Sequence, residues 1–355
     1  MHKDITRRTF LGTGAAALAG CATPKGVPAA RPEPEFMWGN LLHFGLNIQC
    51  DIPVDSWGGK KYFGEDLKLM TAADHVRFDE GVFDRLTDRM AAKGMNTVVI
   101  DLEEALYYPS HPELAVEGTW SVERFRRKLA QLRAKGLEPI PKLNFSTAHD
   151  IWLKEYHRMV STPKYYQVVA DVIADVIDTF EKPRFFHIGF DEEIYSIQDV
   201  NKFEYKRLRS GNVWWNDFLW FVREVEGHGM RPWIWSDLCW DKPEEFVSRM
   251  PRTVLQSNWY YRTQFDVTKL EGRLKRRIET YRTLDKGWFD QVPCGSTFVC
   301  RENFELTIAH CRNVTKSDRL KGFLMAPWYY GTQEEQRDKI MESLDVMGEA
   351  IAKWG

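Results

Sequence analysis

Short apolar runs that end in polar residues recur along the chain, and each is followed by a segment whose apolar positions have helical spacing. This alternation is typical of βα units around a parallel sheet. The predicted strands are Met37–Ile48, Thr97–Leu102, Glu138–Phe145, Arg184–Phe190, Pro232–Asp237, Val254–Trp259, Ser296–Cys300 and Gly322–Trp328. The predicted helices include Phe83–Lys93, Val122–Lys135, Tyr165–Phe180, Trp214–Glu226, Leu270–Tyr281 and Glu334–Lys353.

These alternating units occupy roughly 320 residues, a length that suits one (β/α)8 barrel. We therefore predict an α/β fold of the TIM-barrel class, with residues 36–355 forming a single domain. A doubly wound open sheet is the alternative, but no Gly-rich phosphate loop follows the first predicted strand. No second Pro-, Gly- or Ser-rich linker divides these residues, which favours one domain over two.

The first 21 residues have the pattern of an export signal. Arg7 and Arg8 precede a short run of small and apolar residues, and Leu18-Ala19-Gly20-Cys21 is similar to the cleavage box of bacterial lipoproteins. The run is shorter than the about 20 apolar residues that a membrane-spanning helix needs. A buried N-terminal helix is the alternative. We predict twin-arginine export and lipid attachment at Cys21.

This prediction carries expectations about partners and location. The partners are the twin-arginine translocase and the lipoprotein-processing machinery, and the protein is held on the periplasmic or cell-surface side by the lipid alone. Residues 22–35 contain four prolines and lack a periodic apolar pattern, so we expect a Pro-rich tether.

Composition excludes several other function classes. The formal net charge is −2, and no basic patch indicates a nucleic-acid partner. The cysteines beyond Cys21 form no CxxC pair, so they indicate either one disulfide or free buried thiols. No His/Asp cluster has metal-ligand spacing on one element, and we expect neither a metal nor a cofactor.

The predicted strand ends, where barrels of this class hold their catalytic groups, combine carboxylates with aromatic rings. Such rings stack on sugar faces while carboxylates bind hydroxyls or transfer a proton, so we predict a glycan substrate. The 14 tryptophans also fit a barrel core, which is the alternative for any one of them. The candidate site residues are Glu103, Asn144, His149, Asp191, Glu192, Trp235, Asp237, Trp259, Tyr260, Trp328 and Glu302.

The sharpest motif is the segment RFFHIGFDEE at residues 184–193. It resembles the fourth-strand end, His-Ile-Gly-Gly-Asp-Glu, of glycoside hydrolase family 20, the β-N-acetylhexosaminidases. The resemblance implies that Asp191 orients the substrate's 2-acetamido group, which itself attacks the anomeric carbon. It implies that Glu192 is first the general acid and then the base. Family 20 is a substrate-assisted exception to the usual pair of enzyme carboxylates.

Weaker similarities extend this resemblance over much of residues 37–330. The stretch 141–149 is similar to the family's third-strand segment, which also ends in a histidine, and 233–237 to its fifth-strand region. The resemblance implies that Trp259 and Trp328 form walls of an acetamido pocket and that Tyr260 binds the acetamido oxygen. Two features depart from the family: Phe190 replaces the second glycine, and the early arginine for sugar hydroxyls is absent.

A physical argument for Glu192 is independent of the family. The neighbouring acids Asp191 and Glu193 and partial burial would raise the pKa of Glu192 toward the range of a general acid. In the alternative, Glu193 and one neighbour only cap the next helix.

Two other functions remain open. A retaining glycosidase would pair Glu192 with Glu302 as nucleophile, which requires a carboxyl separation of about 5 to 5.5 Å. A barrel without catalysis would be a carbohydrate-binding surface lipoprotein, as Phe190 and the missing arginine suggest.

Overall fold

The computed structural model describes residues 35–49, 71–194, 206–329 and 331–355, which fall in one compact unit. The predicted export signal with Cys21, and the predicted tether up to residue 34, lie outside the described residues.

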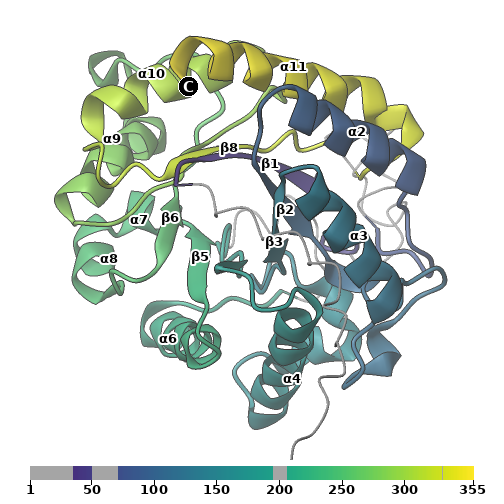
Figure 1. The fold of residues 1–355 in the computed structure, drawn as a ribbon. Coiled ribbons are helices and arrows are strands. Elements are labelled where there is room, and N and C mark those ends of the chain that lie inside the picture. The colour runs from purple at the N-terminus through teal and green to yellow at the C-terminus, as the bar shows by residue number, and fades with distance from the viewer. Residues whose placement is uncertain (1–34, 50–70, 195–205, 330) are drawn as a thin grey trace, which may run out of the picture. The chain divides into compact units, whose positions relative to one another are not determined.

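Parallel strands form a nearly closed barrel with helices around it, which confirms the predicted (β/α)8 class (Figure 1). The strand order is β6-β5-β4-β3-β2-β1-β8-β7. Backbone N–H groups of Val292 and Cys294 donate to Gln256 and Asn258 at 2.9 Å and join the two ends of the sheet. The strands are β1 (Met37–His43), β2 (Thr97–Asp101), β3 (Glu138–Lys142), β4 (Phe185–His187), β5 (Arg231–Trp235), β6 (Leu255–Ser257), β7 (Cys294–Gly295) and β8 (Gly322–Met325).

The α-helices follow the strands and cover the outside of the barrel (Figure 1). Asp79, Ser121 and Thr162 precede three of them, and each side chain accepts the backbone N–H of the residue three positions later. These caps satisfy donors that a helix leaves unpaired at its start. The helices are α2 (Glu80–Ala92), α3 (Val122–Ala134), α4 (Pro163–Thr179), α6 (Gly211–Gly227), α7 (Leu238–Asp241), α8 (Pro243–Arg249), α9 (Gly272–Lys286), α10 (Asn303–Val314) and α11 (Arg337–Trp354).

Short 3₁₀ turns complete the connections. They are η3 (Glu103–Ala105), η4 (Pro112–Leu114), η5 (Ile151–Met159), η6 (Val267–Lys269) and η7 (Glu334–Gln336).

The core has two apolar layers, because side chains alternate across each strand. In β5, Trp233 and Trp235 belong to the cluster inside the barrel, whereas Ile234 belongs to the cluster between strands and helices. The inner layer contains the aromatic rings of Phe185, Trp233, Trp235, Trp240 and Trp259.

The seventh strand was predicted too late in the chain. The run Ser296–Cys300 lies after β7, in a loop, because the strand consists of the short segment Cys294–Gly295. Proline at 293 and two neighbouring small or sulfur-containing side chains give this strand almost no β-type pattern. Helices α7, α8 and α10 were not predicted.

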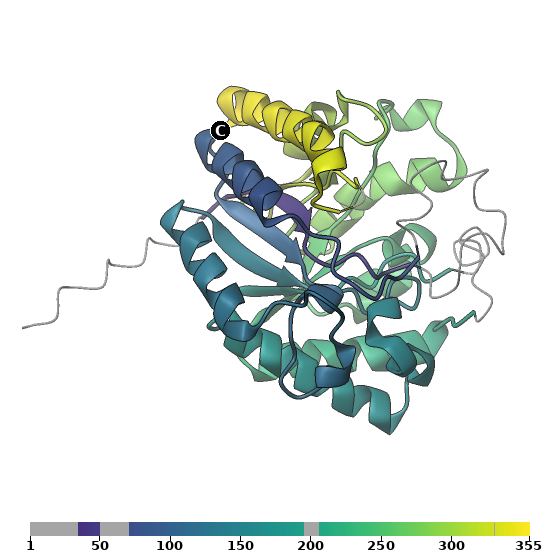
Figure 2. The ribbon, with the colours of Figure 1, turned by 90° about the vertical axis from the view of Figure 1, so that its right-hand side faces the viewer.

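The C-terminal helix α11 packs beside α2, which brings the two ends of the barrel domain together (Figure 2). Arg89 Nε donates to Asp345 Oδ1 at 2.8 Å across this contact. In the described part of the chain, no helix combines the length and apolar character needed to cross a membrane.

Candidate active site

The backbone after β4 turns sharply and presents an acidic pair at the barrel rim. Gly189 has a φ of +73°, and a Cβ atom there would lie 2.1 Å from Asn144 Oδ1, so a side chain does not fit. Phe190 also has a positive φ of +68°. Its ring points away from the acids and packs against Trp214 and Phe218 of α6, with ring centroids 5.5 and 5.3 Å away. The phenylalanine therefore packs beneath the site and does not crowd it.

Asp191 is held from the β3 side of the barrel. Asn144 Nδ2 donates to its Oδ1 at 2.9 Å, and the Ser146 hydroxyl donates to its backbone carbonyl. His149 Nε2 lies 3.6 Å from its Oδ2. Burial, with the nearby charge of Glu192, raises the pKa of Asp191, although His149 opposes this shift.

Glu192 is fixed through both its backbone and its side chain. Its φ is +58°, and its N–H donates to Asp237 Oδ2 at 2.9 Å. Its Oε2 lies 3.4 Å from His149 Nε2. Burial would raise the pKa of Glu192, but the hydrogen bond and charge of His149, with the charges of Arg277 and Arg273, lower it overall. The expected rise in its pKa is therefore wrong for the free protein.

The partners of Glu192 have shifted pKa values of their own. Although burial opposes it, the charges of Asp191 and Glu192 raise the pKa of His149 to about 8. Burial and the charge of Asp191 raise the pKa of Asp237 to about 8. Asp237 Oδ1 is buried and has no hydrogen-bond partner among the described residues. At neutral pH, His149 is thus mostly a cation and Asp237 mostly a neutral acid that retains a proton to donate.

Glu193 has a structural role in the described part of the chain, whereas the helix that it was alternatively predicted to cap lies outside the described residues. Its side chain is buried and forms an ion pair with Arg209, whose Nε donates to Glu193 Oε2 at 3.1 Å. It also accepts the N–H of Thr147 at 3.0 Å. The Arg209 guanidinium lies 4.6 Å from the centre of the Phe190 ring. This buried pair anchors the loop that carries Asp191 and Glu192 to the loop after β3.

A second layer of charged groups lies below the acidic pair. Glu103 is fully buried with a φ of +36°, and its Oε1 accepts the N–H of Asn144 at 3.2 Å. Lys142 Nζ lies 2.5 Å from Asp101 Oδ1 and 3.9 Å from Glu103 Oε1. Burial and Asp101 raise the pKa of Glu103 well above its ordinary value. Glu103 therefore supports Asn144 from below and reaches Asp191 only through it.

Lys142 and Asp101 were not among the candidate residues. A lysine inside the apolar run of the third predicted strand was the available signal, because a buried lysine requires an acidic partner.

The aromatic wall comes from β5 and from the segments that follow β6 and β8. Trp235 and Trp328 have ring centroids 5.6 Å apart, and Trp328 has a φ of +55°. Trp259 stacks on Tyr261 with centroids 5.1 Å apart. These rings belong to the inner cluster or pack against it, and the binding roles predicted for the three tryptophans remain predictions.

The candidate role of Tyr260 requires a correction. Its hydroxyl donates to the Gln264 carbonyl at 2.8 Å, and its ring belongs to the outer cluster between strands and helices. Tyr261 occupies the inner face instead, because neighbouring side chains on an extended chain point to opposite sides. The alternation from Trp259 was a signal that could have identified Tyr261.

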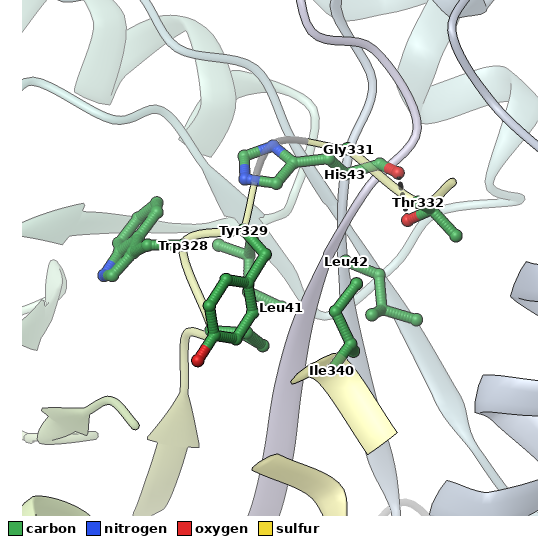
Figure 3. Close-up of a pocket in the computed structure, with 9 residues that line it drawn as sticks. Leu41, Leu42, His43, Trp328, Tyr329, Gly331, Thr332 and Ile340 are labelled. Atoms are coloured by element: carbon green, nitrogen blue, oxygen red, sulfur yellow. Dashed lines mark hydrogen bonds between the residues drawn. The ribbon is translucent and has the colours of Figure 1, made fainter. Parts of the chain in front are cut away.

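A small pocket opens beside this wall at the ends of β1 and β8 (Figure 3). His43 lines the polar side of the pocket and Trp328 lines its aromatic side, and the centroids of the two rings are 6.1 Å apart. The Thr332 hydroxyl donates to the His43 carbonyl at 2.6 Å and closes one end. The remaining lining consists of Leu41, Leu42, Pro327, Tyr329, Gly331 and Ile340.

Glu302 does not join the acidic cluster. It is exposed where α10 begins, and its neighbour Asn303 turns inward to donate to the Tyr260 and Arg262 carbonyls at 2.8 and 2.9 Å. The seventh predicted strand end thus contributes no inward carboxylate at this position.

The described cysteines form no disulfide bonds. Cys239, Cys294, Cys300 and Cys311 are free thiols, and Cys50 lies outside the described residues. In the part of the chain that the structure describes, no group of three or more His, Cys, Asp or Glu side chains is arranged to hold a metal ion.

The fold resembles that of several solved hexosaminidases. A β-N-acetylhexosaminidase from Bacteroides fragilis matches with a TM-score of 0.57 and 11% identity, over 88% of this chain and 66% of its own. A GH20 exo-β-N-acetylglucosaminidase from Vibrio harveyi matches with a TM-score of 0.58 and 14% identity, over 90% and 54%. A GH20 β-N-acetylhexosaminidase from Streptomyces coelicolor matches with a TM-score of 0.59 and 12% identity, over 88% and 64%.

This chain therefore spans less than two thirds of the length of each of these proteins. Identity at this level shows a shared barrel fold. No protein-family model and no curated protein sequence matches the chain.

Proposed function

We propose that the protein is a glycoside hydrolase acting on glycans that contain N-acetylhexosamine. The observation that carries the proposal is the placement of Asp191 and Glu192 at the rim, where one histidine nitrogen contacts both carboxylates at 3.6 and 3.4 Å. The barrel shared with the solved hexosaminidases supports the same substrate class.

In the proposed mechanism, Asp191 accepts a hydrogen bond from the N–H of the substrate's acetamido group. The acetamido oxygen then attacks the anomeric carbon while the glycosidic bond breaks and Glu192 protonates the leaving oxygen. An intramolecular nucleophile needs accurate orientation, and Asn144 fixes the Asp191 carboxylate for this purpose. Water, deprotonated by Glu192, opens the cyclic intermediate and restores the sugar with retained configuration.

The lowered pKa of Glu192 calls for a proton source. His149 is mostly protonated at neutral pH and lies within reach of Glu192 Oε2. We propose that it supplies the proton to Glu192 when substrate displaces water from the pair. Asp237 has an unpaired buried Oδ1 and is proposed to donate a hydrogen bond to the sugar.

The test is release of a chromogenic aglycone from β-N-acetylglucosaminide and β-N-acetylgalactosaminide. Glu192→Gln is expected to lose about 10²- to 10⁴-fold in turnover, and Asp191→Asn about 10²-fold or more. Glu155→Gln and Asp178→Asn are matched controls on exposed acids. If the wild type binds sugar but turns over neither these substrates nor a wider glycan panel, the result would favour the binding-only lipoprotein.

The retaining mechanism with Glu302 has a separate test. A fluorinated glycosyl substrate forms a covalent adduct on an enzyme nucleophile, whereas substrate assistance leaves the protein unlabelled. The exposed position of Glu302 leads us to expect no adduct.

We also propose that the chain is exported by the twin-arginine translocase and anchored through a lipid on Cys21. The arginine pair, the short apolar run and the Leu-Ala-Gly-Cys box support this proposal.

A further inference from the structure

Arg277, in the second turn of α9, lies beside the candidate active site. Its guanidinium carbon is 4.1 Å from the centre of the Trp240 ring and 4.5 Å from that of Trp259. Trp259 belongs to the inner cluster, and Trp240 follows Asp237 by one turn. Asn258, the residue before Trp259, donates from Nδ2 to the Arg277 carbonyl at 2.8 Å and ties the helix to β6. The cation is therefore placed against the aromatic wall.

The neighbouring arginines have acidic partners, but Arg277 has none among the described residues. Arg273 and Arg276 share the carboxylate of Asp241, at 3.0 and 2.9 Å. Arg277 forms no ion pair with any described residue, and its buried Nε has no hydrogen-bond partner among them. Of these three cations on one helix face, two are paired with a single carboxylate and Arg277 is paired with no described acid.

The acids of the active site interact with this charge through space but form no ion pair with it. Glu192 is already in contact with His149, which is mostly protonated at neutral pH. Asp237 is mostly protonated because burial and Asp191 raise its pKa to about 8. The charge of Arg277 still acts on Glu192 and Asp237, which places it near the reacting groups. On the α9 side, Arg277 is therefore a cation that interacts with Glu192 through space but has no ion-pair partner among the described residues.

We propose that Arg277, supported by Arg273, binds an anionic substituent of the sugar substrate, a sulfate ester or a carboxylate. A guanidinium presents paired N–H donors in one plane, which match two oxygens of such a group. The guanidinium lies against the Trp240 and Trp259 rings and donates no hydrogen bond to a described residue, so its donors are available for a ligand. The sugar identity rests on the proposed function, whereas the preference for an anion rests on Arg277.

Calorimetry on the full chain tests the proposal without requiring turnover. The probes are N-acetylglucosamine, its 3-, 4- and 6-sulfates, and glucuronic acid. At least one anionic probe is expected to bind roughly tenfold more tightly than the neutral sugar at low salt, with the advantage reduced by added NaCl. Preference for a sulfate or for the uronic acid identifies the source of the anion. Equal binding of neutral and anionic probes overturns the proposal.

Variants of Arg277 test whether this residue is responsible for the preference for anionic over neutral sugars. Arg277→Gln is expected to reduce the anionic-to-neutral affinity ratio to about one, and Arg277→Lys to an intermediate value because one donor fork is lost. Arg282→Gln, an exposed arginine of the same helix, is expected to keep the wild-type ratio. If Arg277→Gln does not fold, the affinity ratio of Arg277→Lys tests the assignment instead. A wild-type ratio in a folded Arg277 variant refutes the assignment.

The same measurements separate this inference from the proposed hydrolysis. Anion-selective binding that depends on Arg277, without turnover of any sulfated or neutral glycoside, would retain the subsite and reject hydrolysis. Turnover with no selectivity for charged substrates would retain hydrolysis and reject the subsite.

Discussion

His149 Nε2 lies 3.4 Å from Glu192 Oε2, and this contact joins the loop after β3 to the end of β4. The contact favours an imidazolium and a carboxylate, because it raises the pKa of one partner and lowers that of the other. The protonation state of the acid/base candidate is thus set by a residue 43 positions earlier in the chain.

The first prediction concerns the pH dependence of stability. The pKa of His149 is about 8 in the folded protein, against 6.5 without perturbation. This raised pKa contributes about 2 kcal/mol to the free energy of unfolding below pH 6.5, and the contribution is lost as the pH rises through 8. Thermal unfolding between pH 6 and 9 should show the wild type losing Tm relative to His149→Gln. Parallel curves for the two proteins contradict this role of His149.

The second prediction concerns Asp237, whose folded pKa of about 8 lies above its ordinary value of 3.8. Keeping this proton favours the folded state at low pH, and that advantage decreases as the pH rises from 3.8 through 8. Asp237→Asn mimics the neutral acid and can still accept the Glu192 N–H. We expect the variant to be more stable than the wild type at pH 8, with the difference vanishing near pH 4. Urea unfolding at both pH values measures it, and a constant difference would falsify the prediction.

The third prediction compares two adjacent tyrosines. Tyr261 lies on the inner aromatic wall, so we expect its hydroxyl to bind substrate and Tyr261→Phe to lower kcat/KM by about tenfold. Tyr260→Phe removes the hydrogen bond to Gln264 and should cost about 1 kcal/mol of unfolding free energy without changing kinetics. The opposite assignment of the two effects would restore Tyr260 as the site residue.

The fourth prediction concerns Phe190. Because its ring packs against α6, Phe190→Ala should cost about 3 to 5 kcal/mol of unfolding free energy. The folded fraction should keep most of its turnover, since the ring does not face the acids. Phe190→Leu is the control and should lose less stability. Denaturant unfolding and activity at low temperature measure both, and a large loss of turnover in a stable variant would place the ring in the site.

The fifth prediction concerns the N-terminus. Cys21→Ser should abolish incorporation of an alkyne-labelled fatty acid and release the protein from the membrane fraction. Replacing Arg7 and Arg8 by lysine should leave the precursor unexported. Labelling that persists in Cys21→Ser is incompatible with attachment at this residue.

Several features of the barrel were accessible from the pattern of residues alone. Seven predicted strands overlap observed ones, because runs such as Thr97–Leu102 combine β-branched side chains with polar ends. The motif at 184–193 indicated the acidic pair. The two-residue strand β7 was not predicted at its observed position, because so short a segment has no periodicity to detect.

The sequence by itself determined the fold class, the acidic pair at one strand end and the aromatic character of the rim, because these depend on local periodicity and residue type. Only the tertiary structure decided which groups meet and which charges are compensated. It brought His149 to Glu192, turned Tyr261 inward in place of Tyr260, and left Arg277 without an acidic partner among the described residues. Contacts between distant segments and the burial of charges set the protonation of this site, and neither is encoded in neighbouring positions.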